Sequence, residues 1–249
     1  MTKYGLIGYP LGHSFSASFF NEKFCREQLN AVYENYEIST IEDFQQVITD
    51  NPTLKGLNVT IPYKQQIIPF LHALSTEAQA IGAVNVIQFM RQDNNLRIVG
   101  HNTDVIGFRK SIEPLLSSSH KRALILGTGG ASKAVNYALR SIGIKTSFVS
   151  RTEGKSDFTY QQITPALLHE YTVIVNCSPL GMFPHIDGCP PLPYEAMSKD
   201  HLLYDLVYNP EETLFLKKGR KQGTITKNGL EMLHLQAIAA WSIWQNEES

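Results

Sequence analysis

Short apolar runs alternate with segments of helical periodicity in the first part of the chain. The apolar runs cover residues 4–10, 31–38 and 54–61, and the helical segments cover residues 16–29, 41–48 and 62–74. Such an alternation of strands and helices predicts βαβ units and a parallel sheet. The stretch 85–102 differs, because two β-prone runs flank Asp93-Asn94-Asn95, so we expect a hairpin to close this region.

A second alternation follows a helical segment at 104–117. Its strand-like runs, with the loops that end them, cover 122–130, 145–152, 172–178 and 202–208, and a helix is expected at 133–143. Strands that end in loops rich in Gly, Ser and Asn and then lead into helices are typical of an open α/β sheet. The final apolar helix, 228–244, is expected to pack back on the first region. We therefore predict an α/β fold with two α/β domains, residues 1–103 plus 229–249 and residues 104–228.

Composition narrows the function classes. Hydrophobic residues make up 43% of the 249 residues and charged residues 18%, as in globular proteins. The net charge of −1 argues against a nucleic acid as the main partner. We find no apolar run of the ~20 residues that span a bilayer and no signal peptide, which favours a cytoplasmic protein. The sequence leaves open whether the protein is a monomer or a homodimer.

Cysteine and histidine residues do not suggest a metal site. The three cysteines, Cys25, Cys177 and Cys189, are too scattered for a disulfide framework or a zinc site. The eight histidines, His13 among them, show no ligand spacing, so we expect no metal. Cys177 follows a strand, and we expect a buried small residue there rather than a nucleophile, because no partner base is evident.

Residues 123–135 predict a strand, a glycine turn and a helix. Gly127 and Gly129 allow a tight turn and a close approach to a pyrophosphate, and the amide groups at the helix N-terminus face its oxygens. Gly130 and Ala131 open the helix, and Ser132 stands at the third position of the fingerprint, where glycine is usual. The alternative interpretation is a tight turn between core elements.

The end of the second strand carries the predicted cofactor preference. NAD sites place an acidic residue ~20 residues beyond the glycine loop, where it binds the ribose hydroxyls. Here that region reads Ser150, Arg151 and Thr152, with Lys155 close by. A carboxylate would repel a 2′-phosphate, whereas a guanidinium binds it with two hydrogen bonds. We therefore predict NADP rather than NAD, the alternative being a surface arginine that follows a strand.

Polar residues in the first domain also lie at predicted strand ends, where ligands of open α/β sheets bind. These residues are Ser14, Ser16, Thr60 and Asn85. Taken singly, each has a structural explanation, such as a helix cap, a turn or a position within a strand. Lys64, placed in the first turn of the expected helix, is by itself best explained as a solvated charge.

Together, however, the motifs resemble those of the shikimate dehydrogenase family. The matching segments run in the family's order over essentially the whole chain: GYPLGHSFS at 8–16, NVTIPYK at 58–64, IGAVN at 81–85, NTD at 102–104, GTGGASKA at 127–134, SRT at 150–152, YDLVYNPEET at 204–213 and NGLEMLHLQA at 228–237. This resemblance implies a discontinuous substrate-binding domain and an NADP-binding Rossmann-like domain, facing each other across a cleft.

The resemblance also implies an activity, the NADPH-dependent interconversion of 3-dehydroshikimate and shikimate, and a set of residue roles. Lys64 and Asp104 would form the catalytic pair. The substrate carboxylate would be held by Ser14, Ser16 and Tyr208. The ring hydroxyls would be held by Thr60, Asn85 and Gln236. The cofactor would contact Gly127, Gly129, Gly130, Ala131, Ser150, Arg151, Thr152, Lys155, Leu206 and Gly229.

Several positions depart from the family pattern. Ala17 and Val86 replace the proline and threonine that are usual there, and Ser150 replaces an asparagine. The helix expected after the basic loop is missing, since the chain runs from residue 150 almost directly to the next segment. Two alternatives therefore stay open: a quinate/shikimate dehydrogenase that uses NAD, and a catalytically silent dinucleotide-binding module.

Overall fold

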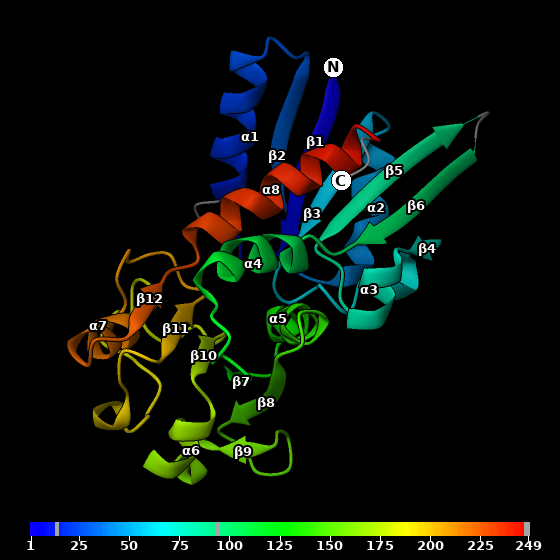
Figure 1. The fold of residues 1–249 in the computed structure, drawn as a ribbon. Helices are drawn as coiled ribbons and strands as arrows, with labels where there is room; N and C mark the ends of the chain where they lie inside the picture. Colours follow the sequence, from blue (N-terminus) through cyan, green and yellow to red (C-terminus); the bar gives the residue numbers. More distant parts are fainter. Residues whose placement is uncertain (13–14, 93–94, 247–249) are drawn as a thin grey trace. The chain divides into compact units, whose positions relative to one another are not determined.

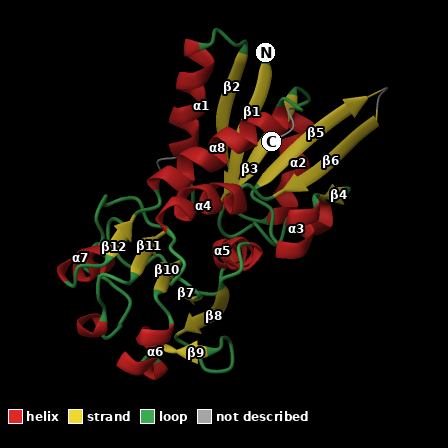
Figure 2. Cartoon of the chain, in the orientation of Figure 1, coloured by secondary structure: helices red, strands yellow, loops and turns green. Residues whose placement is uncertain are grey.

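The computed structural model describes residues 1–12, 15–92 and 95–246 (Figure 1). The chain divides into two compact units, one formed by Met1–Thr103 with the chain from Ala237, the other by Asp104–Gln236. Each unit contains a six-stranded sheet with helices, which confirms the predicted α/β class with two α/β domains (Figure 2). The boundary at which the chain returns from the second unit to the first lies between Gln236 and Ala237, inside the last helix. The sequence suggested a boundary between residues 228 and 229.

The first unit has the strand order β2-β1-β3-β5-β6-β4. Its strands are β1 (Thr2–Gly8), β2 (Ala31–Glu37), β3 (Leu54–Val59), β4 (Ala73–Leu74), β5 (Val86–Gln92) and β6 (Asn95–His101). β1 pairs in parallel with β2 and β3, as the alternation predicted. β5 and β6 form the predicted antiparallel hairpin, and residues 93–94 of its turn lie outside the described residues.

Helices cover both faces of this first sheet. They are α1 (Phe15–Arg26), α2 (Phe44–Asp50), α3 (Thr76–Ile81) and the end of α8 (Leu230–Trp244). On one face, Phe20 of α1 and Trp244 of α8 pack around Tyr4 of β1. Gly56 leaves room for the Trp244 indole, whose Nε1 donates to the Ile87 carbonyl at 3.0 Å. The prediction that the final helix packs back on the first region is confirmed.

The prediction of a helix over residues 62–74 is wrong. Residues 61–67 form turns, followed by a 3-10 helix at Ile68–Phe70 and by β4. The Lys64 carbonyl accepts a hydrogen bond from the Val84 amide at 2.7 Å, so a distant segment takes an acceptor that an α-helix would use internally. Pro69 has no amide hydrogen and disfavours the α conformation at Ile68. Lys64 therefore lies in a turn and not in a first helical turn.

The second unit has the strand order β12-β11-β10-β7-β8-β9, and each neighbouring pair is parallel. The strands are β7 (Arg122–Leu126), β8 (Lys145–Ser150), β9 (Phe158–Thr159), β10 (Val173–Asn176), β11 (Leu202–Asp205) and β12 (Ile225–Lys227). Counted within the unit, this order is 3-2-1-4-5-6, the order of dinucleotide-binding sheets. Its helices are α4 (Asp104–Ile112), α5 (Gly130–Ser141), α6 (Pro165–Glu170), α7 (Leu214–Lys221) and the start of α8.

The expected helix at 104–117 is shorter than predicted. α4 ends at Ile112 and continues as a 3-10 helix at Glu113–Leu115, which contains Pro114. Phe108 packs edge-on against the Tyr204 ring of β11 with the centroids 5.0 Å apart, and Ser111 hydrogen-bonds to the Tyr204 hydroxyl. These contacts fix α4 to the second sheet.

Candidate functional site

The second sheet offers a ligand site at its topological switch point, between β7 and β10. Gly127 follows β7 with a φ of +112°, a conformation that favours glycine. Its amide donates to the Val149 carbonyl at 2.9 Å, and a Cβ there would lie 3.4 Å from the Cys177 carbonyl group after β10. The glycine turn and the β10 loop therefore meet at the carboxyl edge of the sheet.

The N-terminus of α5 fits a phosphate group. Gly129 is the N-cap residue, no side chain caps this end, and a Cβ on Gly129 would meet no atom within 4 Å. Gly130 and Ala131 form the first turn, as expected. Ser132 is fully buried and its hydroxyl donates to the Gly129 carbonyl at 2.6 Å, so serine satisfies its own polar group at the third fingerprint position. The open space in front of uncapped amides suits a pyrophosphate.

The loop after β8 exposes the predicted basic residues. The Ser150 hydroxyl donates to the Thr152 carbonyl at 2.7 Å and accepts from the Thr152 amide at 3.1 Å, which shapes the turn around Arg151. Arg151 and Lys155 are exposed, and Arg151 makes no ion pair within the described residues. The Arg151 guanidinium lies near enough to Tyr160 to oppose the rise in the pKa of that phenol, which burial causes.

Residues 151–164, all of them described, contain turns, β9 and a 3-10 helix at Tyr160–Gln162, with α6 only afterwards. The connection after the basic loop therefore contains no α-helix before α6, in agreement with the gap noted in the sequence. Asp157 accepts from the Phe148 amide at 2.7 Å and so ties the loop back to β8. The acidic residues Glu153 and Asp157 offset the charge of the two basic residues, which the sequence reasoning had not considered.

Leu206 and Gly229, two residues expected to contact the cofactor, lie against each other. The Gly229 amide donates to the Val207 carbonyl at 3.2 Å, and a Cβ on Gly229 would collide with the Leu206 carbonyl oxygen. Only glycine allows the start of α8 to approach the β11 loop this closely. Tyr208, on the same loop, is 38% exposed, and burial of its phenol raises the pKa of that group.

A buried carboxyl group, Asp205, organises the same loop and was missed by the sequence reasoning. Its Oδ1 accepts from Asn176 Nδ2 at 2.9 Å and from the Val207 amide at 3.0 Å, and its Oδ2 accepts from Thr213 Oγ1 at 2.5 Å. Burial raises the pKa of Asp205 to about 6, against the effect of these donors. The available signal was an acidic residue inside the apolar run LLYDLVY.

Asp104 opens α4 and is 2% exposed. Burial raises the pKa of the Cys177 thiol, and the carboxylates of Asp205 and Asp104 raise it further. This keeps Cys177 protonated, as befits a residue that is no nucleophile, although the side chain is half-buried rather than fully buried. It also places Asp104 within electrostatic range of the β10 loop, at the switch point.

Asp104 and Gln236 lie on two helices of the second unit that approach closely. Gly107, one turn after Asp104 and on the same face of α4, would place a Cβ 2.6 Å from the Met232 carbonyl oxygen and 3.1 Å from the Gln236 Cβ. The missing side chain therefore lets α8 lie directly on α4. The structure thus brings the faces of α4 and α8 that carry these two candidate residues together.

In the first unit, candidate substrate residues gather at the carboxyl ends of β1 and β3. The Thr60 amide donates to the Ile7 carbonyl at 2.9 Å, and its methyl group occupies the space that a side chain on Gly8 would need. Ser16 hydrogen-bonds to the Tyr33 hydroxyl. Ser14 lies outside the described residues.

Asn58 is a residue of this group that sequence reasoning did not select. Its Oδ1 accepts from the Tyr33 hydroxyl at 2.7 Å, and its Nδ2 donates to the Asn85 carbonyl at 3.4 Å. Asn58 therefore links Ser16, through Tyr33, to the segment that carries Asn85. A polar residue inside the strand, at the first position of the motif NVT, was the signal that could have identified it.

Lys64 is half-buried and belongs to the first unit, whereas Asp104 is the first residue of the second. Lys64 is tied to Val84 through its backbone, and the neighbouring Asn85 accepts from the Thr103 amide at 2.7 Å. Thr103 immediately precedes Asp104. These contacts bring the backbone of Lys64 and the turn before Asp104 to one short segment, and the meeting of the two side chains stays a prediction.

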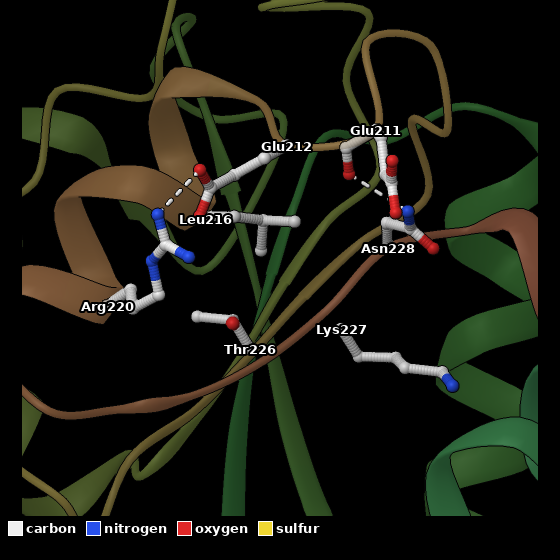
Figure 3. Close-up of a pocket in the computed structure, with 7 residues that line it drawn as sticks. All are labelled: Glu211, Glu212, Leu216, Arg220, Thr226, Lys227 and Asn228. Atoms are coloured by element: carbon white, nitrogen blue, oxygen red, sulfur yellow. Dashed lines mark hydrogen bonds and ion pairs between the residues drawn. The ribbon is translucent and has the colours of Figure 1, made fainter.

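A further cavity of about 490 Å³ lies beside α7 and β12 (Figure 3). Its two cationic side chains are already paired, Arg220 with Glu212 at 2.9 Å and Lys227 with Glu231 at 2.5 Å. It is therefore a poor anion site in comparison with the uncapped start of α5. Among the described residues, no group of His, Cys, Asp and Glu side chains is arranged to hold a metal ion, and no helix has the length and apolar character needed to cross a membrane.

Comparison with known proteins yields one family. A model of the shikimate dehydrogenase substrate binding domain matches residues 6–87. The shikimate dehydrogenase (NADP(+)) of Carboxydothermus hydrogenoformans is 38% identical over 257 residues, covering 96% of this chain and 90% of that protein. A crystal structure of a shikimate dehydrogenase in complex with NADP+ is similar with a TM-score of 0.86 and 33% identity, over 99% of this chain and 91% of the other.

A related enzyme of different specificity is also similar. The quinate dehydrogenase of Corynebacterium glutamicum in complex with NAD has a TM-score of 0.85 at 27% identity, over 99% of this chain and 94% of the other. The two structural similarities are nearly equal, so the fold alone does not separate the substrates. The identity to the Carboxydothermus enzyme over almost the whole length shows that the chain belongs to the shikimate dehydrogenase family.

Proposed function

We propose that the protein catalyses the reversible NADPH-dependent reduction of 3-dehydroshikimate to shikimate, a step of chorismate and aromatic amino-acid biosynthesis. The observation that carries this proposal is the family membership, which rests on a relative that covers 96% of this chain, and it is supported by the glycine turn at the switch point of the second sheet. The first unit, which matches the family's substrate-binding model, supplies the polar residues that a small polyol acid requires.

Reduction of a ketone requires a hydride on carbon and a proton on oxygen. NADPH, when bound, supplies the hydride. The Lys64 ammonium stabilises the negative charge that develops on the oxygen and donates the proton, so no metal ion is needed. Asp104 accepts a hydrogen bond from the reacting hydroxyl and orients the Lys64 ammonium. In the oxidation of shikimate the same groups take the hydroxyl proton back.

Recognition of the substrate rests on hydrogen bonds. Ser14, Ser16 and Tyr208 hold the carboxylate, and the ring hydroxyls are held by Thr60, Asn85 and Gln236. Each hydroxyl of the substrate then has a protein partner, so an analogue that lacks one leaves a buried group unpaired and is rejected strongly. Quinate carries an extra hydroxyl on a saturated ring, so its exclusion depends on fit rather than on a missing partner.

The cofactor preference follows from the loop after β8. Arg151, exposed and without an ion pair among the described residues, is proposed to bind the 2′-phosphate of NADP, with Lys155 nearby. The phosphate-binding residues are Gly127, Gly129, Gly130 and Ala131, and Ser150 with Thr152 shapes the turn. Leu206 and Gly229, whose backbones lie against each other, would complete the cofactor site.

One assay tests the proposal against its alternatives. Shikimate and quinate are each offered with NADP and with NAD, and the absorbance of the reduced nicotinamide is followed. The proposal expects reduction with shikimate and NADP at the highest kcat/KM. Preference for quinate with NAD would favour the quinate/shikimate relative, and no reduction with any pair would favour a silent dinucleotide-binding module.

A further inference from the structure

Three consecutive residues, Ala83, Val84 and Asn85, hold both segments that carry the candidate catalytic pair. The Val84 amide donates to the carbonyl of Lys64 at 2.7 Å. The Ala83 carbonyl accepts from Asn102 Nδ2 at 2.9 Å. These bonds join the segment to the turn that contains Lys64 on one side and to residues just before Asp104 on the other.

The Asn85 side chain makes a second and closer attachment to the same turn. Its Oδ1 accepts from the Thr103 amide at 2.7 Å, and its Nδ2 donates to Thr103 Oγ1 at 3.0 Å. Asn85 is 4% exposed, Asn102 3% and Thr103 0%. Because these groups are removed from water, solvent does not replace a hydrogen bond that is lost, which makes the arrangement sensitive to single changes.

The segment is itself fixed within the first sheet. The Asn85 amide donates to the His101 carbonyl at 3.1 Å, and its carbonyl accepts from the Val59 amide at 2.9 Å. It therefore lies between the carboxyl end of β3 and the end of β6. A rigid attachment of this kind suits a group that must keep two distant parts of the chain in a constant relation.

We propose that Asn102 and Thr103 are positioning residues of the reaction, an inference that rests on the proposed function. Through Ala83 and Asn85 they fix the point from which Asp104 enters α4, while Val84 of the same segment fixes the backbone of Lys64. Catalysis depends on such placement, since a displacement of about 1 Å costs on the order of 10²-fold in rate.

Thr103 allows the sharpest test. Thr103→Val keeps the shape of the side chain and removes the oxygen that Asn85 Nδ2 uses, whereas Thr103→Ser keeps that oxygen. We expect Thr103→Val to lower kcat by roughly 10- to 100-fold with little change in KM for shikimate, and Thr103→Ser to restore most of the rate. Hydrogen exchange of the amides at 101–106 should be faster in Thr103→Val than in the wild type.

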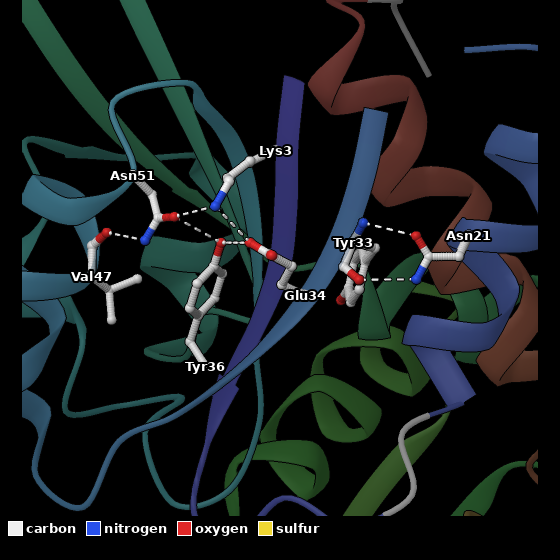
Figure 4. Close-up of polar contacts among 7 residues, drawn as sticks. All are labelled: Lys3, Asn21, Tyr33, Glu34, Tyr36, Val47 and Asn51. Carbon is white, nitrogen blue, oxygen red and sulfur yellow. Dashed lines mark hydrogen bonds and ion pairs between the residues drawn. The ribbon is translucent and has the colours of Figure 1, made fainter. Parts of the chain in front are cut away.

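Asn102 has a matched control in the same unit. Asn51 is similarly buried, and its Nδ2 donates to the Val47 carbonyl at 2.9 Å, the same bond type and length as that of Asn102 (Figure 4). Asn51 precedes β3, at the end of the sheet opposite to Asn85. Asn51 Oδ1 also accepts from Lys3 Nζ at 2.8 Å, so Asn51→Ala should lower the midpoint of thermal unfolding at least as much as Asn102→Ala, whereas only Asn102→Ala should lower kcat.

The results separate this inference from the proposed function. A wild type that is active with shikimate and NADP, combined with Thr103→Val and Asn102→Ala variants within two-fold of its kcat, overturns the inference alone. So does an equal loss of kcat in Asn51→Ala. A wild type inactive with every substrate and cofactor pair removes the proposed function and with it this role, whatever the amide exchange shows.

Discussion

The contribution of the buried carboxyl group of Asp205 to the stability of the protein should fall as the pH rises through the mildly acidic range. The pKa of Asp205 is raised from 3.8 to about 6 in the folded chain, chiefly because burial disfavours the charged form. The unfolded chain therefore loses this proton at a lower pH than the folded chain does. Between about pH 4 and pH 6 the contribution of Asp205 to the free energy of unfolding consequently decreases with rising pH, and above pH 7 this contribution is constant.

The size of the effect follows from the two pKa values. A shift of roughly two units corresponds to roughly 3 kcal/mol over the whole titration, at about 1.4 kcal/mol per unit. In the accessible interval from about pH 4.5 to 7.5, the contribution of Asp205 falls by about 2 kcal/mol. Asp205→Asn removes the titration and keeps the shape, with Oδ1 still accepting from Asn176 and Val207 and the new amide donating to the Thr213 hydroxyl.

The assay is urea unfolding of the wild type and of Asp205→Asn at several pH values. The free energy of unfolding of the variant minus that of the wild type should increase by about 2 kcal/mol from pH 4.5 to 7.5. Glu27→Gln is a control of opposite sign, because the hydrogen bond from Lys23 lowers the pKa of Glu27, whose contribution is therefore lost as the pH falls. A flat difference for Asp205→Asn, or one that decreases with pH, refutes the reasoning.

Substitutions at three further positions, Lys64, Arg151 and Gly107, test the site itself. Lys64→Ala should lower kcat by roughly 10²–10⁴-fold with a smaller change in substrate binding. Lys64→Arg should also be slow, because arginine keeps the charge but does not readily release a proton. A kcat of Lys64→Ala within a few-fold of the wild type would assign the proton transfer to another group. Arg151→Ala should raise KM for NADP by roughly 10- to 100-fold and leave KM for NAD almost unchanged, since only the bond to the 2′-phosphate is lost; an unchanged KM for NADP contradicts that role. Gly107→Ala would place its Cβ 2.6 Å from the Met232 carbonyl and should cost about 1–3 kcal/mol in urea unfolding, whereas an unaffected stability would show that α4 and α8 separate easily.

The sequence predicted those parts of the fold that depend on periodic burial. Strands β1, β3, β7 and β10 appear as apolar runs because most of their side chains are buried. A buried strand can therefore be identified from the residues of the strand itself. Residues 62–74 have the pattern of a helix. The Lys64 carbonyl nevertheless accepts its hydrogen bond from the amide of Val84, a partner that no local pattern reveals. Long-range hydrogen bonds thus override local propensity.

The same reason explains which site residues were found. Glycines such as Gly127 and Gly229 indicate close backbone approaches, and the motif resemblance supplied the candidate catalytic pair, which stays a prediction. Asn58 and Asp205 act through partners brought together only by the sheet order, so their importance is not visible one residue at a time. The second division of the chain was placed too early, because α8 is one continuous helix that belongs to both units.

The places where the chain passes from one unit to the other explain why the candidate residues occur where they do. Asp104 is the first residue of the second unit and Gln236 is its last, so each is joined by a peptide bond to the first unit, at Thr103 and Ala237. Within the second unit, Gly107 lets the two helices that carry Asp104 and Gln236 lie in direct contact. The two points at which the chain leaves and re-enters the first unit are therefore close to each other within the second unit. The proposed roles of Asp104 and Gln236 in acid–base chemistry and substrate binding fit these positions, because each residue is joined to the first unit by a single peptide bond.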